Sequence, residues 1–293
     1  MNIEDFDLLT SIIRQRSGLV LTKEKAYLLE SRLMPVARKW NLKTLDDLAI
    51  AIRARRDEAM IFDVVEAMTT NETSFMRDQK PFDSFMQVVL PRLLASRASS
   101  RRIRIWSAAS STGQEAYSLA MLLLENQAKW QGWQIDIVGT DLSRDVVEKA
   151  RAGIYTQFEV QRGLPITMLV KYFTKNGDKW QLKDNVRQMA NFIEGNLLHD
   201  LPPQFGPLYS SSAPFDVVFC RNVLIYFDMP TKTKVLEATA NLMAPDGVLY
   251  LGGAETVLGI TNRFKPVEGQ RGLYMKDTPQ ATSLYANLKT GAA

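Results

Sequence analysis

Residues 106–121, W-S-A-A-S-S-T-G-Q-E-A-Y-S-L-A-M, join a short apolar run to an amphipathic helical pattern. A loop of small residues between a strand and a helix lets the backbone approach a ligand, and the first helical N–H groups lack partners within the helix. The loop has one glycine, Gly113, and no G-x-G-x-x-G fingerprint. Glu115, in the first helical turn, adds a negative charge where a pyrophosphate would sit. The pattern therefore indicates either a loop facing a cationic ligand or an ordinary tight turn, and it argues against a dinucleotide site.

Two more apolar runs end in polar side chains that suit a nucleoside. Asp141 closes Val138-Gly139-Thr140-Asp141, and an acid at such a strand end commonly binds ribose hydroxyls. Its alternative role is to cap the following helix, which Ser143 could do equally well. Asn196, in the turn after a third run, offers a donor and an acceptor to an adenine edge, although asparagine is common in turns. We favour ribose binding for Asp141 and regard Asn196 as the weaker indication.

The run Phe215-Asp216-Val217-Val218-Phe219-Cys220 predicts a buried central strand. Arg221 and Asn222 follow it directly and Tyr226 comes shortly after, at the end of the strand where open α/β sheets bind ligands. Cys220 could be a nucleophile, but no histidine lies in a partner context, so a small buried residue is the better interpretation.

Segment 68–78, M-T-T-N-E-T-S-F-M-R-D, is polar and lies between a helical part and an α/β part of the sequence. Polar residues at a domain junction suit a lid over a cleft, and a plain linker would be equally polar. The residues alone leave both interpretations open.

A parallel sheet would bring these candidates together. Strands are expected at 102–107, 134–140, 190–195, 215–220, 247–252 and 271–276, and helices at 113–129, 143–152 and 230–243. Their alternation predicts a doubly wound α/β sheet with the last strand antiparallel. Residues 153–189 form an excursion too long for a loop, in which we expect 178–182 and 186–189 to pair as a β-hairpin. The polar segment 277–293 is expected to be disordered.

Residues 1–75 predict an all-helical region, because apolar residues such as Phe6, Leu9 and Ile13 recur at helical spacing. Residues 14–56 carry eleven Lys and Arg against four Asp and Glu. This excess suggests an anionic partner surface, although a solvated helix face explains the charge alone slightly better.

Composition narrows the class of protein. The 293 residues, 46% of them hydrophobic, suffice for one large or two modest domains. One cysteine and one histidine exclude an intrachain disulfide and a Cys/His zinc site, so we expect no metal and a cytoplasmic location. No apolar run is long enough to span a membrane, and the acidic N-terminus lacks the apolar core of a signal peptide.

Six stretches resemble, in family order, the chemotaxis receptor methyltransferases of the CheR type: T-T-N-E-T-S-F-M-R-D, W-S-A-A-S-S-T-G-Q-E-A-Y-S, G-T-D-L-S, A-R-A-G-I-Y, G-N-L-L and F-D-V-V-F-C-R-N-V-L-I-Y-F-D. The resemblance covers about residues 5–276. It implies a helical receptor-facing domain over 1–75 and a Rossmann-like α/β methyltransferase domain over 76–276 with an inserted β subdomain at 153–189. The implied reaction transfers a methyl group from S-adenosyl-L-methionine to glutamate side chains of membrane chemoreceptors, leaving methyl esters and S-adenosyl-L-homocysteine.

The resemblance also implies roles for single residues. The cofactor is expected to contact Asn71, Thr73, Arg77, Glu115, Asp141, Asn196, Leu197, Arg221 and Asn222. Arg77 and Tyr226 are expected to orient the substrate glutamate. The cytoplasmic helical bundle of the receptors is expected to contact Lys25, Arg32, Arg38 and Lys39. We expect a monomer with no nucleic-acid partner and no insertion into the membrane.

The chain departs from the family pattern in three places. Residues 113–118 read G-Q-E-A-Y-S instead of G-E-E-P-Y-S, which retains Glu115. Residues 253–255 read G-A-E where many members have His-Ser-Glu or Ser-Glu. The turn Asn176-Gly177-Asp178 is shorter than the loop of members that dock a receptor's C-terminal pentapeptide, which argues against such tethering here.

The chemistry itself needs few catalytic groups. A glutamate side chain has a pKa of about 4.3, so it is a carboxylate at neutral pH and needs no general base. Alignment and exclusion of water are what the transfer requires. Arg77 and Tyr226 argue against a non-catalytic adaptor that only binds the cofactor. Residues 221–224 read R-N-V-L where enzymes that methylate amino groups of nucleic acids usually have an acid-Pro-Pro-aromatic motif. The chain also lacks the glycine fingerprint of a dinucleotide-binding oxidoreductase, which argues against that class of enzyme.

Overall fold

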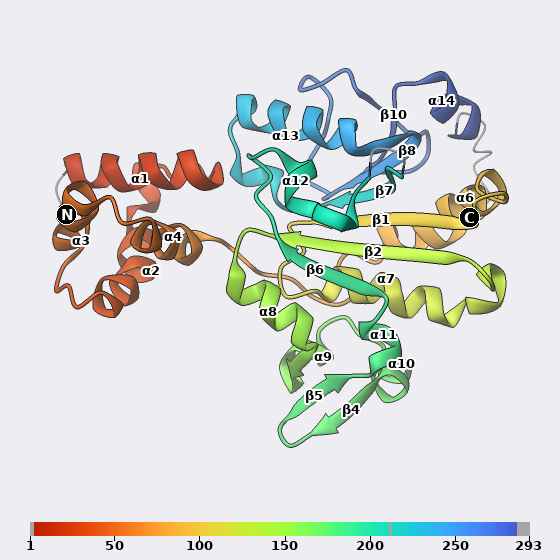
Figure 1. Cartoon of the computed structure of the whole chain (residues 1–293), viewed down its shortest axis with the longest axis horizontal. Helices are drawn as coiled ribbons and strands as arrows, with labels where there is room; N and C mark the ends of the chain where they lie inside the picture. The colour runs from red at the N-terminus through yellow and green to blue at the C-terminus, as the bar shows by residue number, and fades with distance from the viewer. Residues whose placement is uncertain (1–2, 211–212, 286–293) are drawn as a thin grey trace. The chain divides into compact units, whose positions relative to one another are not determined.

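The computed structural model describes residues 3–210 and 213–285, and the chain divides into two compact units (Figure 1). One unit comprises Met1–Thr70 and Tyr226–Lys232, and the other comprises Asn71–Ile225 and Thr233–Ala293. The division therefore falls at 70/71, slightly before the domain boundary suggested by the sequence. In addition, the segment Tyr226–Lys232, which the sequence assigns to the α/β domain, is grouped with the helical unit.

Four helices form the first unit: α1 (Ile3–Ser17), α2 (Ala26–Lys39), α3 (Leu45–Arg55) and α4 (Glu58–Met68). Helices α1 and α2 each pack against both α3 and α4, because each helix carries an apolar stripe at helical spacing. The fully buried residues of this core include Leu9, Ile13, Leu29, Leu33, Leu48 and Val64. The predicted all-helical character of this region is confirmed.

Local sequence explains where these helices begin. The Thr44 side chain accepts from the Asp47 N–H, and the Asp47 carboxylate accepts from the Thr44 N–H, which is a complete capping box for α3. The Asp57 carboxylate likewise accepts from the first N–H groups of α4. Helix α2 follows a 3₁₀ turn, η1 (Lys23–Lys25), and continues through Pro35.

A seven-stranded sheet with the order β6-β2-β1-β7-β8-β10-β9 forms the second unit. Its strands are β1 (Arg102–Ala108), β2 (Gln134–Asp141), β6 (Ala190–Glu194), β7 (Phe215–Cys220), β8 (Met243–Leu251), β9 (Phe264–Pro266) and β10 (Leu273–Lys276). The first five in spatial order run parallel, and β10 is antiparallel to β8 and β9. The doubly wound α/β prediction is confirmed, whereas the short strand β9 was not predicted.

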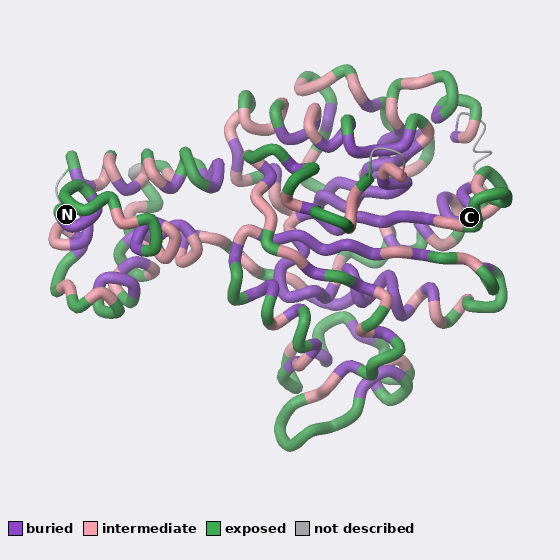
Figure 2. Tube along the Cα trace, viewed as in Figure 1, coloured by how far each residue is buried: buried purple, intermediate pink, exposed green. Residues whose placement is uncertain are grey.

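Helices cover this sheet on both sides, and its central strands are buried over most of their length (Figures 1 and 2). The helices that follow strands are α7 (Gln114–Glu125), α8 (Arg144–Ala152), α12 (Leu201–Phe205) and α13 (Met229–Leu242). The chain enters β1 from α5 (Lys80–Ser84), a π-helical turn η2 (Phe85–Val89) and α6 (Leu90–Ser96). The parallel register places Ala108 beside Thr140 and Cys220 beside Leu251, so the predicted site residues follow strand ends on one edge.

The excursion after α8 is a small subdomain, but its pairing differs from the predicted hairpin. It contains β3 (Ile154–Thr156), α9 (Gln157–Gln161), α10 (Ile166–Tyr172), β4 (Phe173–Asn176), β5 (Lys179–Leu182) and α11 (Asp184–Arg187). Strand β5 pairs antiparallel with β3 and β4, and residues 184–187 are helical. The prediction that 186–189 would pair with 178–182 was wrong, because a better-placed partner lies just before the turn at Gly177.

The end of the described chain is also ordered, contrary to prediction. Helix α14 (Pro279–Tyr285) packs against β8 and β10, with Ala281 and Tyr285 buried. The expected disorder of 277–293 is therefore wrong for 277–285, and 286–293 lie outside the described residues. Among the helices of the described ranges, none combines the length and the apolar character needed to cross a bilayer.

Candidate active site

Most left-handed backbone conformations outside glycine in the larger unit lie on three segments. Positive φ occurs there at Met76 (50°), Asp78 (63°), Gln79 (27°), Ala109 (56°), Ser111 (51°) and Asn222 (60°), and in the same unit also at Arg101, just before β1. Such conformations are uncommon and persist where surrounding contacts hold them, often at ligand sites. The same three segments carry most of the residues predicted to bind the cofactor.

The loop between β1 and α7 depends on Gly113. This residue has a φ of 92°, and a Cβ there would lie 3.0 Å from the Ala150 Cβ and 3.1 Å from the Phe192 ring. A larger residue would push α7 away from α8 and β6. Gly113 precedes α7 without a side-chain cap, so no capping side chain satisfies the first N–H groups of the helix.

Asp141 organises the same loop. One carboxylate oxygen accepts from the Ser111 N–H at 2.8 Å, and the other accepts from the Ser143 N–H at 3.1 Å. The Ser143 hydroxyl accepts from the Val146 N–H and thus caps α8, so the capping role belongs to Ser143. These two bonds fix the carboxylate at the end of β2, directly beside the β1–α7 loop.

Glu115 and Arg221 form a buried ion pair. The Glu115 carboxylate accepts from the Ser107 hydroxyl at 2.8 Å and from Arg221 Nη1 at 2.9 Å. Only 2% of the Arg221 side chain is exposed, and its Nη2 also donates to the Arg77 carbonyl and the Asp78 carboxylate. One guanidinium therefore joins β7, α7 and the segment before α5. Two carboxylates around one guanidinium leave a net negative charge, which favours a cationic ligand.

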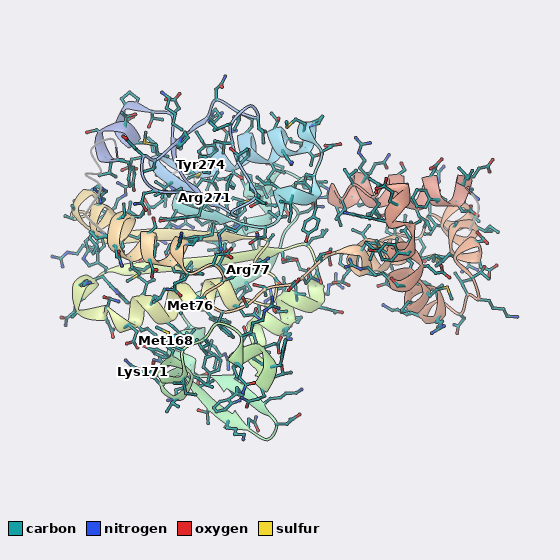
Figure 3. The ribbon with its side chains drawn as sticks, turned by 180° about the vertical axis from the view of Figure 1, so that it is seen from behind. Met76, Arg77, Met168, Lys171, Arg271 and Tyr274 are labelled. Atoms are coloured by element: carbon teal, nitrogen blue, oxygen red, sulfur yellow. The ribbon has the colours of Figure 1, made fainter. Side chains whose placement is uncertain are left out.

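Segment 71–77 is bound along the β1–α7 loop. The Ser111 hydroxyl donates to the Asn71 carbonyl at 2.8 Å, and the Met76 N–H donates to the Ser118 hydroxyl at 2.9 Å. Arg77 Nη1 donates back to the Glu72 carbonyl at 2.9 Å. Figure 3 shows Met76 and Arg77 on the same side of the molecule as Met168 of α10. Segment 71–77 is therefore fixed by hydrogen bonds to the β1–α7 loop and to α7.

The excursion supports this segment from its other side. Phe75 packs edge-on against Tyr155 and Phe173, with ring centroids 5.0 and 5.7 Å away. A Cβ at Gly163 would lie 2.1 Å from the Phe75 carbonyl oxygen, so only glycine permits this approach. Tyr155 also donates its hydroxyl hydrogen to the Thr112 carbonyl at 2.8 Å, and burial raises the pKa of Tyr155, which keeps that hydrogen in place.

Asn196 and Leu197 form the turn after β6. The Asn196 side-chain oxygen accepts from the Leu198 N–H at 3.0 Å, and Gln204 bonds both the N–H and the carbonyl of Asn196. Leu197 is buried. The asparagine therefore shapes the turn itself, which is the common role for this residue type.

The end of β7 presents Asn222 and encloses Cys220. Asn222 has a left-handed φ of 60°, and the Glu255 carboxylate accepts from its N–H at 2.8 Å. Cys220 is fully buried, and burial raises the pKa of its thiol well above the usual value. Its place in the core agrees with a packing role.

Tyr226 and the predicted receptor-binding residues belong to the helical unit. Arg32 donates to the carbonyls of Met68 and Thr69 at the end of α4, and Lys39 pairs with Asp63 at 2.9 Å. Within the described part of the chain, the side chains of Lys25 and Arg38 are exposed and have no hydrogen bond or ion pair. Arg32 and Lys39 are therefore fixed by contacts within the helical unit, whereas the side chains of Lys25 and Arg38 extend into solvent.

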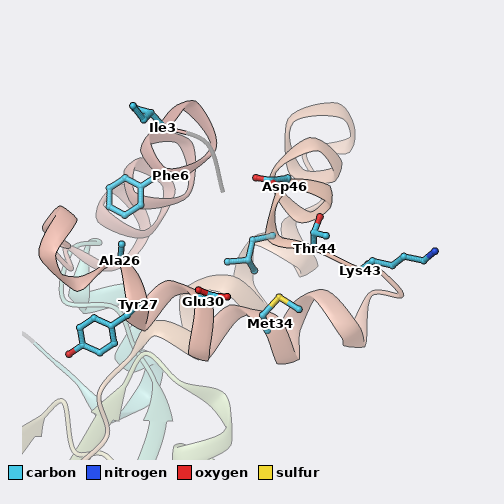
Figure 4. Close-up of a pocket in the computed structure, with 10 residues that line it drawn as sticks. Ile3, Phe6, Ala26, Tyr27, Glu30, Met34, Lys43, Thr44 and Asp46 are labelled. Carbon is cyan, nitrogen blue, oxygen red and sulfur yellow. The ribbon is translucent and has the colours of Figure 1, made fainter.

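A hollow of about 800 Å³ also lies in this unit, between α1, α2 and the start of α3 (Figure 4). Its lining includes the apolar residues Phe6, Tyr27 and Met34 and the polar residues Glu30 and Lys43. None of the residues predicted for the cofactor lines it.

The sequence analysis gave no role to three residues that hold these segments together: Ser118, Tyr155 and Glu255. All three lie within the part of the chain that resembles the family, but their bonding partners on the other segments are more than 30 residues away in the sequence, so no local pattern reveals what they bind. Over residues 3–210 and 213–285, no group of His, Cys, Asp and Glu side chains is arranged to hold a metal ion.

The fold and the site define a Rossmann-like methyltransferase that uses S-adenosylmethionine. Residues 71–273 match the family described as CheR methyltransferase, SAM binding domain, and residues 4–69 match its all-alpha domain. The chain belongs to the CheR methyltransferase family.

Curated relatives agree over nearly the full length. The chain is 39% identical over 267 residues to a chemotaxis protein methyltransferase of Vibrio parahaemolyticus, covering 90% of this chain and 93% of the relative. It is 37% identical over 273 residues to chemotaxis protein methyltransferase 1 of Pseudomonas aeruginosa, covering 92% and 96%.

Solved structures give weaker matches. The CcbJ methyltransferase of Streptomyces caelestis is 16% identical with a TM-score of 0.31, covering 55% of this chain and 50% of that chain. The glycopeptide N-methyltransferase MtfA complexed with sinefungin is 11% identical with a TM-score of 0.33, covering 63% and 52%.

Proposed function

We propose that this enzyme transfers the methyl group of S-adenosyl-L-methionine to glutamate side-chain carboxylates of membrane chemoreceptors, giving glutamate methyl esters in chemotaxis adaptation. The observation that carries the proposal is the buried Arg221 between Glu115 and Asp78, which creates an anionic site at the sheet edge. Such a site suits a sulfonium cofactor. The chemotaxis role is supported by the names of the relatives.

The proposed cofactor contacts follow the chemistry of each side chain. Glu115 would bind the amino group of the methionine part, and the Asp141 carboxylate, at the end of a central strand, would bind ribose hydroxyls. Asn196 and Leu197, in the turn after β6, would contact the adenine. The remaining proposed contacts are Asn71, Thr73, Arg77, Arg221 and Asn222.

The reaction is an in-line displacement that needs no proton transfer. A carboxylate oxygen of the substrate glutamate forms a bond to the methyl carbon while the bond from that carbon to sulfur breaks. The electron pair goes to sulfur, so the sulfonium becomes the neutral thioether of S-adenosyl-L-homocysteine and the carboxylate becomes an ester. The enzyme contributes alignment and exclusion of water.

Arg77 and Tyr226 are the residues we propose to orient the substrate carboxylate. A guanidinium has five N–H donors, and the described contacts of Arg77 use one of its nitrogens on the Glu72 carbonyl. The others suit a carboxylate, for which arginine is the preferred partner. The Tyr226 hydroxyl would donate one further hydrogen bond.

The partner we propose is the cytoplasmic helical bundle of the receptors, met by the basic residues Lys25, Arg32, Arg38 and Lys39. The protein would act as a monomer in the cytoplasm, without membrane insertion or a nucleic-acid partner. The short connection between β4 and β5 argues against tethering by a receptor pentapeptide.

Transfer of labelled methyl groups to receptor-containing membranes tests the proposal. We expect alkali-labile label on the receptors, and much less with the Arg77→Ala variant. Binding of S-adenosyl-L-homocysteine without transfer would indicate an adaptor instead. Salt-sensitive binding to DNA or RNA, with label in nucleic acid, would indicate a different substrate.

A further inference from the structure

The Glu255 carboxylate accepts four backbone hydrogen bonds at the edge of the sheet. Its Oε2 accepts from the N–H groups of Gly252 at 2.7 Å and Asn222 at 2.8 Å. Its Oε1 accepts from the N–H groups of Val223 at 2.9 Å and Ile225 at 3.3 Å. One side chain thus binds both the loop after β7 and the loop after β8.

These N–H groups need a partner because the sheet stops there. Strands β7 and β8 pair as far as Cys220 and Leu251, and beyond these residues the ladder offers no acceptor. Four converging donors favour an acceptor-only group, and a carboxylate has the lone pairs to bind them all. A glutamine of the same size would direct an amide NH₂ at some of these donors.

The Glu255 site also fixes the conformation of Asn222. The positive φ of Asn222 is strained for a residue with a side chain, so surrounding contacts must hold it. A Cβ at Gly252 would lie 2.8 Å from both Asn222 Nδ2 and Glu255 Oε2. The glycine therefore leaves room for the asparagine side chain to lie against the strand end beside the carboxylate.

We infer that Glu255 is a positioning residue for cofactor binding, which acts by holding the β7 loop with Arg221 and Asn222 in the geometry that the cofactor needs. The inference rests on the proposed contacts of Arg221 and Asn222 with the cofactor. It does not depend on which substrate receives the methyl group. Because the reacting groups tolerate little displacement, loosening this loop weakens binding even though Glu255 does not touch the ligand.

Calorimetric titration with S-adenosyl-L-homocysteine tests this role without a receptor. Glu255→Gln should bind about 10- to 100-fold more weakly than the wild-type protein. Glu268→Gln is the matched control, because Glu268 is an exposed glutamate elsewhere in the same unit and should bind normally. All titrations are made at a temperature where circular dichroism shows each variant fully folded. A purely stabilising role would lower the melting temperature of Glu255→Gln and leave the affinity of the folded protein unchanged.

The variant Asn222→Ala tests separately the proposed contact of Asn222 with the cofactor, on which the positioning role of Glu255 rests. If Asn222→Ala binds weakly and Glu255→Gln binds like the wild type, the contact holds and the positioning role is wrong. If both bind like the wild type, the contact of Asn222 is wrong and the inference falls with it. Should Glu255→Gln fail to fold, Glu255→Asp keeps a carboxylate one methylene shorter. Weaker binding by folded Glu255→Asp supports the role, and wild-type affinity overturns it.

Discussion

Arg221 Nη1 lies 2.9 Å from Glu115 Oε2, and the exposed fractions of the two side chains are only 2% and 12%. Removing one partner of a buried pair leaves the other charge without compensation. We therefore expect Arg221→Met to lower the free energy of unfolding by about 3–5 kcal/mol. Denaturant titration measures this value. The control is Arg144→Met, which breaks an exposed pair with Glu194 and should cost less than about 1 kcal/mol. Equal losses in the two variants would contradict the importance of burial.

Tyr155→Phe should weaken cofactor binding while leaving the aromatic packing on Phe75 intact. The substitution removes only the hydroxyl that bonds the Thr112 carbonyl, so about 1 kcal/mol of stability should be lost together with a few-fold loss of affinity for S-adenosyl-L-homocysteine. Tyr172→Phe is the matched control. Tyr172 belongs to the same subdomain as Tyr155, but its hydroxyl donates to Glu125 at the end of α7 and not to the β1–α7 loop. The affinity of this control variant should stay at the wild-type value. The same loss of affinity in both variants would mean that the Tyr155 bond has no specific role.

Lowering the pH should remove the contribution of the Glu125 carboxylate to the stability of the folded protein. Hydrogen bonds from Lys171 and then Tyr172 hold the pKa of the Glu125 carboxyl below its usual value. A lowered pKa in the folded state gives stability that is present above the unfolded pKa of about 4.3 and is lost as the pH falls through the folded pKa. Melting curves of the wild type and Glu125→Gln should therefore differ by a constant amount between about pH 6 and 8 and converge in stronger acid. A difference that persists in strong acid would contradict this origin.

Methyl transfer itself should depend little on pH near neutrality. The carboxylate of the proposed glutamate substrate is already ionised at neutral pH, and burial keeps the Cys220 thiol protonated, so the proposed reaction uses no titrating base. We expect a flat kcat between about pH 6 and 8.5 in single-turnover assays with saturating cofactor. If kcat instead rose with pH with a midpoint near pH 7, the enzyme would use an essential base, and direct attack by the carboxylate would be contradicted.

The strands of the sheet could be predicted because each is a compact apolar run followed by small or polar residues. The ends of β1, β2 and β7 thereby located Glu115, Asp141 and Arg221 near one edge. Their partners could not be predicted in the same way. The bond of Arg221 to Glu115 and that of Tyr155 to Thr112 join residues far apart in the sequence, and only the packed fold decides such pairs.

The failed predictions have local causes. Residues 186–189 look like one strand of a hairpin because Val186 and Met189 are apolar and the residues between them are polar. In the fold, Val186 is instead the buried residue of the short helix α11. Helix α14 was missed because its sequence is mostly polar. Two buried residues four apart, Ala281 and Tyr285, are enough to dock it on the sheet.

The predicted receptor-binding cations should separate into two kinds. Arg38 is exposed, so Arg38→Glu should raise the KM for receptor membranes about fivefold or more, with a larger effect at low salt, because opposite charges then steer association less well. Its melting temperature and its affinity for S-adenosyl-L-homocysteine should not change. Arg32 instead donates to the Met68 and Thr69 carbonyls at 2.8 and 3.0 Å, so Arg32→Met should lower the free energy of unfolding by about 1–3 kcal/mol. If Arg32→Met changed only the receptor KM, and Arg38→Glu only the stability, this division of roles would be wrong.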